Sequence, residues 1–410
     1  MAVCDPDTPA YVITRYLGFV CEDANPVAAL RNPFGLENWT LPVLEVTIIL
    51  GAVLALLHAI RRLRRDNDPT NLALWIGSLV YLFVIEPPLY FPEWFGMQDA
   101  MGFMFAHNVF TVDFMYDRLP LYIVCFYPAL SQVAYEIVRA FGFFDGTKHA
   151  ALKGAVAVAF VYQVFYEIFD QLGPQLKWWA WNVDEPFFGN TAADLGNPAA
   201  VPLLASVPLN SVWLFASVSF GVLTYVSTRL IANPTLAGNA PRGLSLAWRI
   251  VVSGVLAVIS MPLMGIPASV FGRGEGANLT GQAIVLGVEI AALWLVGLYL
   301  LGTQWRKMRA AAASAHSPAR TARPFLLVFP FLFLGVHTAL WIAALPDYFG
   351  ATDGVTDGGT PIGSLPYVIA CLVVALGSLL AALTLGRDRT EPAATAGEGD
   401  AATRQPLNQV

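Results

Sequence analysis

Three polar side chains recur at helical spacing within an apolar segment near the middle of the chain. Gln163, Glu167 and Asp170 are separated by four and three residues, so they share one face of a helix. A carboxyl group among apolar residues at membrane depth is costly, and its neutral form is favoured. Such a group can act as a general acid or carry a proton. We therefore take Glu167 as a candidate catalytic acid, and Gln163 and Asp170 as candidate binding residues.

Single ionisable residues occur in several other apolar segments. Glu289 lies seven residues inside its segment, a depth of ~10 Å in a helix, and is the deepest of the acids. His337 lies ~18 Å along another segment. We expect both to act with Glu167 as catalytic groups, while Glu45 and Glu86, nearer to the ends of their segments, are candidate binding residues. The alternative is that these groups cap helices or form hydrogen bonds between helices.

Aromatic and polar residues outside these positions extend the candidate binding set. Trp178, Trp179 and Trp181 follow the polar helix face in sequence, and amphipathic rings of this type settle at the level of lipid head groups. His107 lies in an interrupted apolar stretch, and Asn210 follows two prolines in another segment. His107 has no partners at metal-binding spacing, so we predict neither a metal site nor a cofactor.

The composition indicates a membrane protein. Hydrophobic residues make up 56% of the 410 residues and charged residues 13%, about half the share of an average soluble domain. The formal net charge of -6 and the lack of a basic patch argue against a nucleic-acid partner. We expect membrane lipid as the partner, with other membrane proteins as further candidates.

Apolar segments long enough to cross a bilayer recur along the chain, each near the about 20 residues that a helix needs. The nine expected spans are 41–60, 72–90, 119–140, 151–170, 201–230, 247–270, 282–304, 325–345 and 366–385. The sequence therefore predicts an all-α, polytopic bundle with about nine transmembrane helices.

Lysine and arginine are distributed unequally between the two sides that these spans define. The segments after the odd-numbered spans hold 18 of the 23 basic residues, and the alternate set holds 5. The positive-inside rule places the richer side in the cytoplasm. We predict an N-terminus outside, a cytoplasmic C-terminus and a plasma-membrane location. Most of the ionisable groups in the spans then share the outer half of the membrane, which predicts a polar vestibule open to the outer face.

This topology divides the chain into three regions. Residues 1–40 form an extracytoplasmic segment, 41–387 the helical domain and 388–410 a disordered cytoplasmic tail. The helical domain has two long outer loops. We expect a re-entrant or interfacial helix in the loop 91–118, and we expect the tryptophan-rich loop 171–200 to form the rim or lid of the vestibule.

The four cysteines are far apart in the sequence and form no zinc-type pattern. Cys4 and Cys21 both lie in the predicted extracytoplasmic segment, where disulfides persist. A bridge between them and two unpaired thiols are the two alternatives.

Stretches in the middle third of the chain have a familiar order of aromatic residues, prolines and small residues. They are DRLPLYIVCFYPALSQVAYEIVRAFG (Asp117–Gly142), LGPQLKWWAWNVDEP (Leu172–Pro186) and VPLNSVWLFASVSFG (Val207–Gly221). Together they resemble an uncharacterised family of multi-spanning membrane proteins from actinobacteria and fungi. They are also distantly similar to the hydratase-type membrane proteins of carotenoid biosynthesis. The resemblance carries no catalytic residue over to this chain.

Three functions fit these features. In the first, acids beside aromatic walls protonate or orient a lipid or isoprenoid, with Glu167 or Glu289 as the acid. In the second, the same acids relay protons in a proton-coupled transporter. In the third, the outer loops bind partners as a structural or assembly subunit of a cell-envelope membrane complex. We favour the first, and whether the chain is an enzyme stays open at this point.

Overall fold

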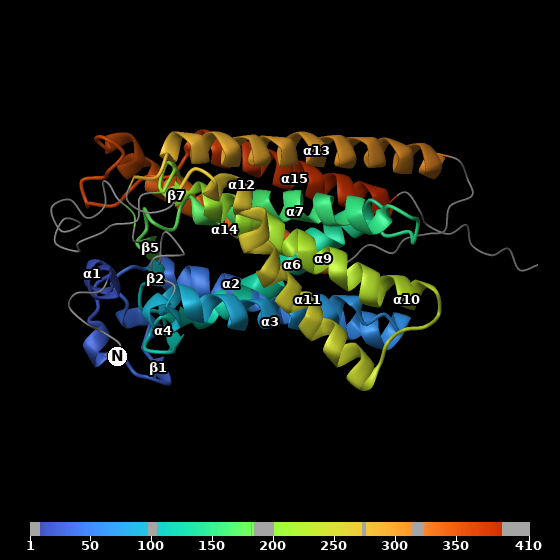
Figure 1. Ribbon diagram of the computed structural model, residues 1–410, viewed down its shortest axis with the longest axis horizontal. Helices are drawn as coiled ribbons and strands as arrows, with labels where there is room; N and C mark the ends of the chain where they lie inside the picture. Colours follow the sequence, from blue (N-terminus) through green and yellow to red (C-terminus); the bar gives the residue numbers. More distant parts are fainter. Residues whose placement is uncertain are drawn as a thin grey trace, which may run out of the picture.

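A computed structural model describes residues 9–96, 105–181, 183, 201–272, 276–313 and 324–387. Within these residues, nine helices are long and apolar enough to cross a membrane, which confirms the predicted all-α bundle of nine spans. The helices run lengthwise through the molecule, and the strands gather with α1 at one end (Figure 1). We call this the strand end. The opposite end carries Arg61, Arg62, Arg65 and Arg139, and we call it the basic end.

The nine spans run alternately between the two ends. The first four are α2 (Thr40–Asp66), α3 (Thr70–Tyr90), α6 (Leu121–Ala140) and α7 (Ala150–Asp170). The fifth combines η3 (Ser211–Val218), α9 (Ser219–Ser227), η4 (Thr228–Ala232) and α10 (Asn233–Leu236). The last four are α11 (Gly243–Met264), α13 (Leu279–Ala313), α14 (Pro324–Gly350) and α15 (Leu365–Arg387), with the short α12 (Ile266–Ser269) after α11.

The fifth span begins about ten residues later than the sequence predicted. The residues before it form a hairpin of β6 (Leu203–Leu204) and β7 (Val207–Pro208) instead. Pro202 and Pro208 lack backbone N–H groups, so a helix through both would lose hydrogen bonds. The span then opens with the π-helical segment η3, a geometry that is rare and frequent at functional sites.

Helices α6 and α7 occupy the centre of the bundle. The most apolar window of α6 is 83% buried and that of α7 is 78% buried, whereas the corresponding window of α13 is 28% buried. Helix α6 packs against α2, α3 and α7, and α7 packs in addition against α9, α13 and α15. Polar side chains on α6 and α7 therefore lie in the protein interior rather than against lipid.

Short strands connect the loops at the strand end. β1 (Ala28–Leu30), β3 (Val112–Phe114) and β4 (Leu119–Pro120) form an antiparallel sheet. β2 (Phe105–His107) pairs with β5 (Trp179–Trp181) and so joins the two outer loops. The remaining short helices here are α1 (Pro9–Tyr16), η1 (Cys21–Asp23), η2 (Pro33–Gly35) and α4 (Pro92–Phe95).

The outer loops differ in part from their predicted form. In the described portion of 91–118, only the single turn α4 is helical, and the remainder is strand and turn. Pairing with β1 and β5 satisfies the backbone groups that an interfacial helix would have satisfied internally. Residues 97–104, most of 182–200 and the tail 388–410 lie outside the described residues.

The cysteines separate into two kinds. Cys21 is disulfide-bonded, so the alternative in which it is a free thiol is wrong. Cys125 and Cys371, both within spans, are free. Cys4 lies outside the described residues.

Candidate functional site

A buried carboxyl group on α3 lies among tyrosine side chains. Glu86 is 1% exposed, and the hydroxyl of Tyr127 on α6 donates a hydrogen bond to its Oε1. Tyr90 and Tyr166 lie close enough to interact electrostatically with the same carboxyl group. No Lys or Arg among the described residues forms an ion pair with Glu86, so phenol groups take the place of a cation.

Two further carboxyl groups lie together where α7 reaches the strand end. Glu167 and Asp170 are buried, one helical turn apart, and interact with each other. Gln171 Nε2 donates to Glu167 Oε2 over 3.1 Å, and the backbone N–H of Ser364 donates to Gln171 Oε1 over 2.8 Å. Gln171 thereby connects Glu167 to the segment that leads into α15. Asp170 lies beside Ser211, at the start of η3.

The polar face predicted on α7 is present, but its first member has a different environment. The indole N–H of Trp294 on α13 donates to Gln163 Oε1 over 3.0 Å, and Gln163 Nε2 donates to the carbonyl of Val212 over 3.0 Å. Both polar ends of Gln163 are therefore used in contacts between helices. This matches the alternative in which a buried polar group serves packing.

Tyrosines connect Glu86 with the pair on α7. Tyr122 and Tyr166 each interact electrostatically with both Glu86 and Asp170. We call the whole group the acid–tyrosine cluster; it consists of Glu86, Tyr90, Tyr122, Tyr127, Tyr162, Tyr166, Glu167 and Asp170. Its acids were predicted as site residues, whereas Tyr90, Tyr122 and Tyr127 were not, because nothing in the sequence places them beside the acids.

Several polar atoms of the acid–tyrosine cluster are buried without a hydrogen-bond partner in the described part of the chain. They include Tyr162 Oη, Glu167 Oε1 and Asp170 Oδ2. Buried polar groups in proteins are nearly always satisfied, and exceptions concentrate where function requires them. These atoms can therefore form hydrogen bonds with a polar or reacting group.

Aromatic rings connect the acid–tyrosine cluster with two histidines. The Phe169 ring lies 4.6 Å from that of Trp179, 5.7 Å from that of Trp178 and 6.0 Å from that of His337, between centroids. The His107 ring lies 5.9 Å from that of Trp179. We call these residues, together with Phe126 and Trp181, the aromatic wall. The rings of the wall are buried inside the protein and are therefore shielded from lipid.

The two histidines are held differently. His337 Nδ1 donates to the carbonyl of Phe333 over 2.8 Å, and its Nε2 has no hydrogen-bond partner among the described residues. His107 Nδ1 lies 2.9 Å from the hydroxyl of Tyr122. Burial lowers the pKa of His107 to about 3, so its ring is neutral at physiological pH. His337, by contrast, packs in the aromatic wall and forms no hydrogen bond with Glu167.

The three predicted tryptophans are enclosed by protein instead of projecting from the surface of the outer loop. Trp178, Trp179 and Trp181 are 0%, 2% and 4% exposed. Pairing of β5 with β2 places Trp179 opposite His107, and Trp178 Nε1 donates to Thr40 Oγ1 over 2.9 Å. These contacts hold the tryptophan-rich segment inside the protein.

Besides Gln163, three predicted site residues lie outside both the acid–tyrosine cluster and the aromatic wall. Glu45 accepts hydrogen bonds from the backbone N–H groups of Thr111 and Val112, at 3.2 and 3.3 Å, and so fastens the first outer loop. Glu289 is half-buried on the peripheral α13, and its Oε2 has no hydrogen-bond partner among the described residues. Asn210 precedes η3, and its Oδ1 is likewise unpartnered in the described structure.

An ion-paired group at the strand end was not anticipated. Arg31 pairs with Asp113 and, at 2.7 Å, with Asp117. Burial raises the pKa of the Asp113 carboxyl to about 8, while the N–H of Phe110 and the charge of Arg31 act in the opposite direction. Arg31 follows β1 in sequence, so these contacts fasten the N-terminal segment to the first outer loop.

The cavity at the strand end is separate from the acid–tyrosine cluster. Its volume is about 390 Å³, and it lies between the N-terminal segment, α2 and the first outer loop. The residues that line it include Leu17, Arg31, Leu41 and Asn108. Within the described residues, no group of three or more His, Cys, Asp or Glu side chains is arranged to hold a metal ion.

Comparison of the chain with protein-family models, curated proteins and solved structures finds no match. The class is therefore defined by the fold: this is a multi-pass membrane protein with nine spans in its described part. Its central helices enclose a set of carboxyl and phenol groups behind an aromatic wall.

Proposed function

We propose that the protein handles a lipid or isoprenoid, and that the acid–tyrosine cluster is its reacting or binding centre. The observation that carries the proposal is the shared environment of Glu86 and Asp170. Both carboxyl groups are buried, both interact with Tyr122 and Tyr166, and neither is paired with a Lys or Arg of the described chain. A neutral carboxyl group in such surroundings is a proton donor.

The chemistry that suits this environment is acid-catalysed addition to a carbon–carbon double bond. A carboxyl group would transfer its proton to one alkene carbon and leave a cation on the other. Faces of Phe126 and Phe169, whose centroids lie 4.4 Å apart, would stabilise that cation through their ring quadrupoles. Water would then add to the cation and return a proton to the carboxylate. Isoprenoids supply such double bonds, and the polar vestibule expected at the outer face would be the entry route.

The test is a water-addition assay with purified protein in labelled water. The probes are a long conjugated isoprenoid polyene and a shorter unconjugated isoprenoid, and mass spectrometry measures incorporation of oxygen and hydrogen from the solvent. Glu86→Gln and Asp170→Asn keep the side-chain volume but remove the transferable proton. Each should lower the rate by about a hundredfold or more, the usual contribution of a general acid.

Glu289→Gln is the matched control, because this acid is half-buried on α13 and outside the acid–tyrosine cluster. Its rate should stay within about twofold of the wild-type rate, well inside the effect of a lost general acid. Full activity in folded Glu86→Gln and Asp170→Asn variants would rule the proposal out. Activity lost only in Glu289→Gln would also rule the proposal out, and it would assign the role of general acid to Glu289 on α13.

A second candidate function, a proton-coupled transporter, is supported by buried polar groups near the basic end of α3 and α6. Asn71 Nδ2 donates to Gln132 Oε1 over 2.7 Å and to Glu136 Oε1 over 3.0 Å. Further along the same two helices, Tyr81 and Tyr127 pack edge to face with centroids 5.5 Å apart. Ionisable or polar side chains therefore follow the α3–α6 contact from Glu136 to the acid–tyrosine cluster.

Glu136→Gln separates the two functions. A proton relay requires the ionisable groups at both of its ends, Glu136 and Glu86. Glu136→Gln should therefore lower solute-driven proton uptake into proteoliposomes about as much as Glu86→Gln does. Chemistry at the acid–tyrosine cluster alone requires Glu86 and does not require Glu136. Water addition that persists in Glu136→Gln therefore favours the lipid-handling function over transport.

We also propose that the protein resides in the plasma membrane with its basic end in the cytoplasm. The support is the unequal division of Lys and Arg between the two sides. Single cysteines placed at Arg64 and at Phe34, which is 95% exposed at the strand end, test this orientation. An impermeant thiol reagent applied to whole cells should label only the second position.

A further inference from the structure

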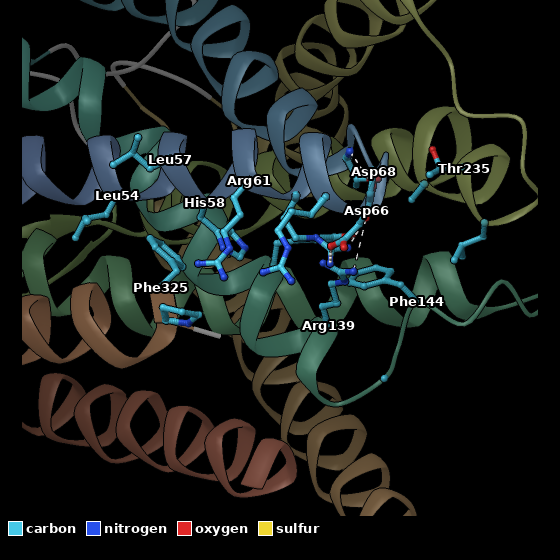
Figure 2. A pocket seen from close by; sticks show the side chains of 18 of the residues that line it. Leu54, Leu57, His58, Arg61, Asp66, Asp68, Arg139, Phe144, Thr235 and Phe325 are labelled. Carbon is cyan, nitrogen blue, oxygen red and sulfur yellow. Dashed lines mark hydrogen bonds and ion pairs between the residues drawn. The ribbon is translucent and has the colours of Figure 1, made fainter. Parts of the chain in front are cut away.

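A second cavity lies at the basic end, away from the acid–tyrosine cluster. It has a volume of about 760 Å³ and is lined by residues of α2, α6, α10 and α14 and of the adjoining loops (Figure 2). The acidic and basic side chains that line it are His58, Arg61, Arg62, Arg65, Asp66, Asp68, Arg139 and Asp145. We call it the basic cavity.

Two of the four arginines already have acidic partners. Arg62 pairs with Asp66 and, at 2.7 Å, with Asp68. Arg139 pairs with Glu136 at 3.2 Å and with Asp68 at 3.6 Å. These contacts hold the ends of α2 and α6 together, and their charges are largely balanced within the protein.

The other two arginines have no such partners. Arg61 and Arg65 lie one helical turn apart on α2, are exposed, and form neither a hydrogen bond nor an ion pair with any described residue. Figure 2 shows Arg61 extending from α2 beside His58, above Phe325. The His58 ring stacks on Phe325 with centroids 5.4 Å apart. Two guanidinium groups with free donors therefore face a cavity, and such groups bind phosphate in a forked geometry.

An apolar stripe leads along α2 to these arginines. Leu50, Leu54, Leu57, Arg61 and Arg65 are separated by four, three, four and four residues, so they lie on one face of the helix. Leu50 and Leu57 are 41% and 57% exposed, and both Leu54 and Leu57 line the basic cavity. The face is apolar in the span and cationic at its end, so it complements the apolar tail and the negatively charged head group of an anionic lipid.

We propose that the basic cavity binds the phosphate head group of an anionic phospholipid, with an acyl chain lying along Leu57 and Leu50. Basic pockets between transmembrane helices on the cytoplasmic side recognise anionic head groups in this way. Free phosphate shares the head-group chemistry, but it would make no use of the apolar stripe. The stripe therefore favours the lipid.

Native mass spectrometry of the purified full-length protein tests the proposal. Phosphatidylglycerol and phosphatidylcholine are offered in equal amounts, and inorganic phosphate is offered in a separate arm. The variant Arg61→Gln/Arg65→Gln should bind phosphatidylglycerol about thirtyfold more weakly than the wild type, from about fivefold for each arginine. Leu57→Ser should weaken binding of the lipid and leave that of inorganic phosphate unchanged.

The matched control removes two charges from the same end but outside the basic cavity. Arg64→Gln/Arg306→Gln alters exposed arginines of α2 and α13 that do not line it, and its affinity should stay within about twofold of wild type, far from the thirtyfold loss. Equal affinity of the wild type for the two lipids, or unchanged affinity in Arg61→Gln/Arg65→Gln, overturns the proposal. Binding of inorganic phosphate with no preference between the lipids overturns the lipid assignment.

Discussion

The hydroxyl of Tyr127 donates a hydrogen bond to the carboxyl group of Glu86 in the interior of the bundle. The two residues belong to neighbouring helices, α6 and α3, which pack directly against each other. The contact therefore contributes to the packing of the bundle and also defines one side of the acid–tyrosine cluster. Each of these roles leads to a measurable consequence.

Tyr127→Phe should lower the stability of the protein by about 1–3 kcal/mol, because the change leaves a buried carboxyl oxygen without its donor. Unfolding in detergent, followed by circular dichroism, measures the loss. Tyr225→Phe is the control, since Tyr225 is 39% exposed on α9. A double-mutant cycle with Glu86→Gln should give a coupling energy of about 1 kcal/mol. Strict additivity of the two single changes would show that the hydrogen bond contributes nothing.

Gly363→Ala should disturb the support of Glu167. A Cβ atom at this position would lie 2.0 Å from the carbonyl oxygen of Gln171, so the segment before α15 must move. Gln171 in turn donates to Glu167. We expect a loss of about 1–3 kcal/mol in stability, as for other overpacked positions.

Gly358→Ala is the matched control for that change, because its added Cβ would meet only Thr356 Oγ1, at an ordinary distance of 3.7 Å in the same loop. The two variants are compared by thermal unfolding and by the water-addition assay. If Gly363→Ala unfolds and reacts like Gly358→Ala, the close approach of Gly363 to Gln171 does not matter for the site.

The spans could be predicted from the sequence because hydropathy and length decide them almost alone. The start of the fifth span could not, since the region from Pro202 to Pro208 is as apolar as a span and only the two prolines mark the hairpin. Strand pairing between the outer loops could not be predicted from the sequence either. β2 and β5 are three residues each and lie more than seventy residues apart in the sequence.

The acids of the site could be predicted because a carboxyl group within an apolar segment is conspicuous. Their partners could not, because Tyr122 and Tyr127 look like ordinary interfacial aromatics until helix packing places them beside Glu86 and Asp170. The half-buried environment of Glu289 could not be predicted for a related reason. Depth along a helix was read from the sequence, but which face of α13 meets the bundle depends on tertiary packing.

Acidification should destabilise the protein through His107. Burial lowers the pKa of this residue from 6.5 to about 3, so the folded state binds fewer protons than the unfolded state between these values. The stabilising contribution of neutral His107 is therefore full above pH 6.5 and is lost as the pH falls toward about 3. At about pH 5 the loss should be about 2 kcal/mol.

His107→Asn tests this, because an amide can replace Nδ1 in the contact with Tyr122 and does not titrate. The difference in stability between wild type and variant, measured by thermal unfolding from neutral to acidic pH, should shrink as the pH falls. His149, at the start of α7, provides the control in His149→Asn. Parallel pH profiles for wild type and His107→Asn would contradict the burial of a neutral ring.

Arg31→Gln should loosen the N-terminal segment from the bundle. The Arg31 side chain is 28% exposed, but Asp113 is fully buried, so the change leaves a buried carboxyl group without its cation. We expect a loss of about 2–3 kcal/mol, below the range for fully buried pairs because Arg31 retains contact with solvent. Limited proteolysis of the strand end, followed by mass spectrometry, should show faster cleavage within the N-terminal segment.

Arg15→Gln is the control, since Arg15 packs over the Tyr11 ring and pairs with no acid among the described residues. Adding Asp113→Asn to Arg31→Gln removes the unpaired carboxyl group and should restore part of the loss; if it deepens the loss instead, the aspartate is held by its other contacts and not by Arg31.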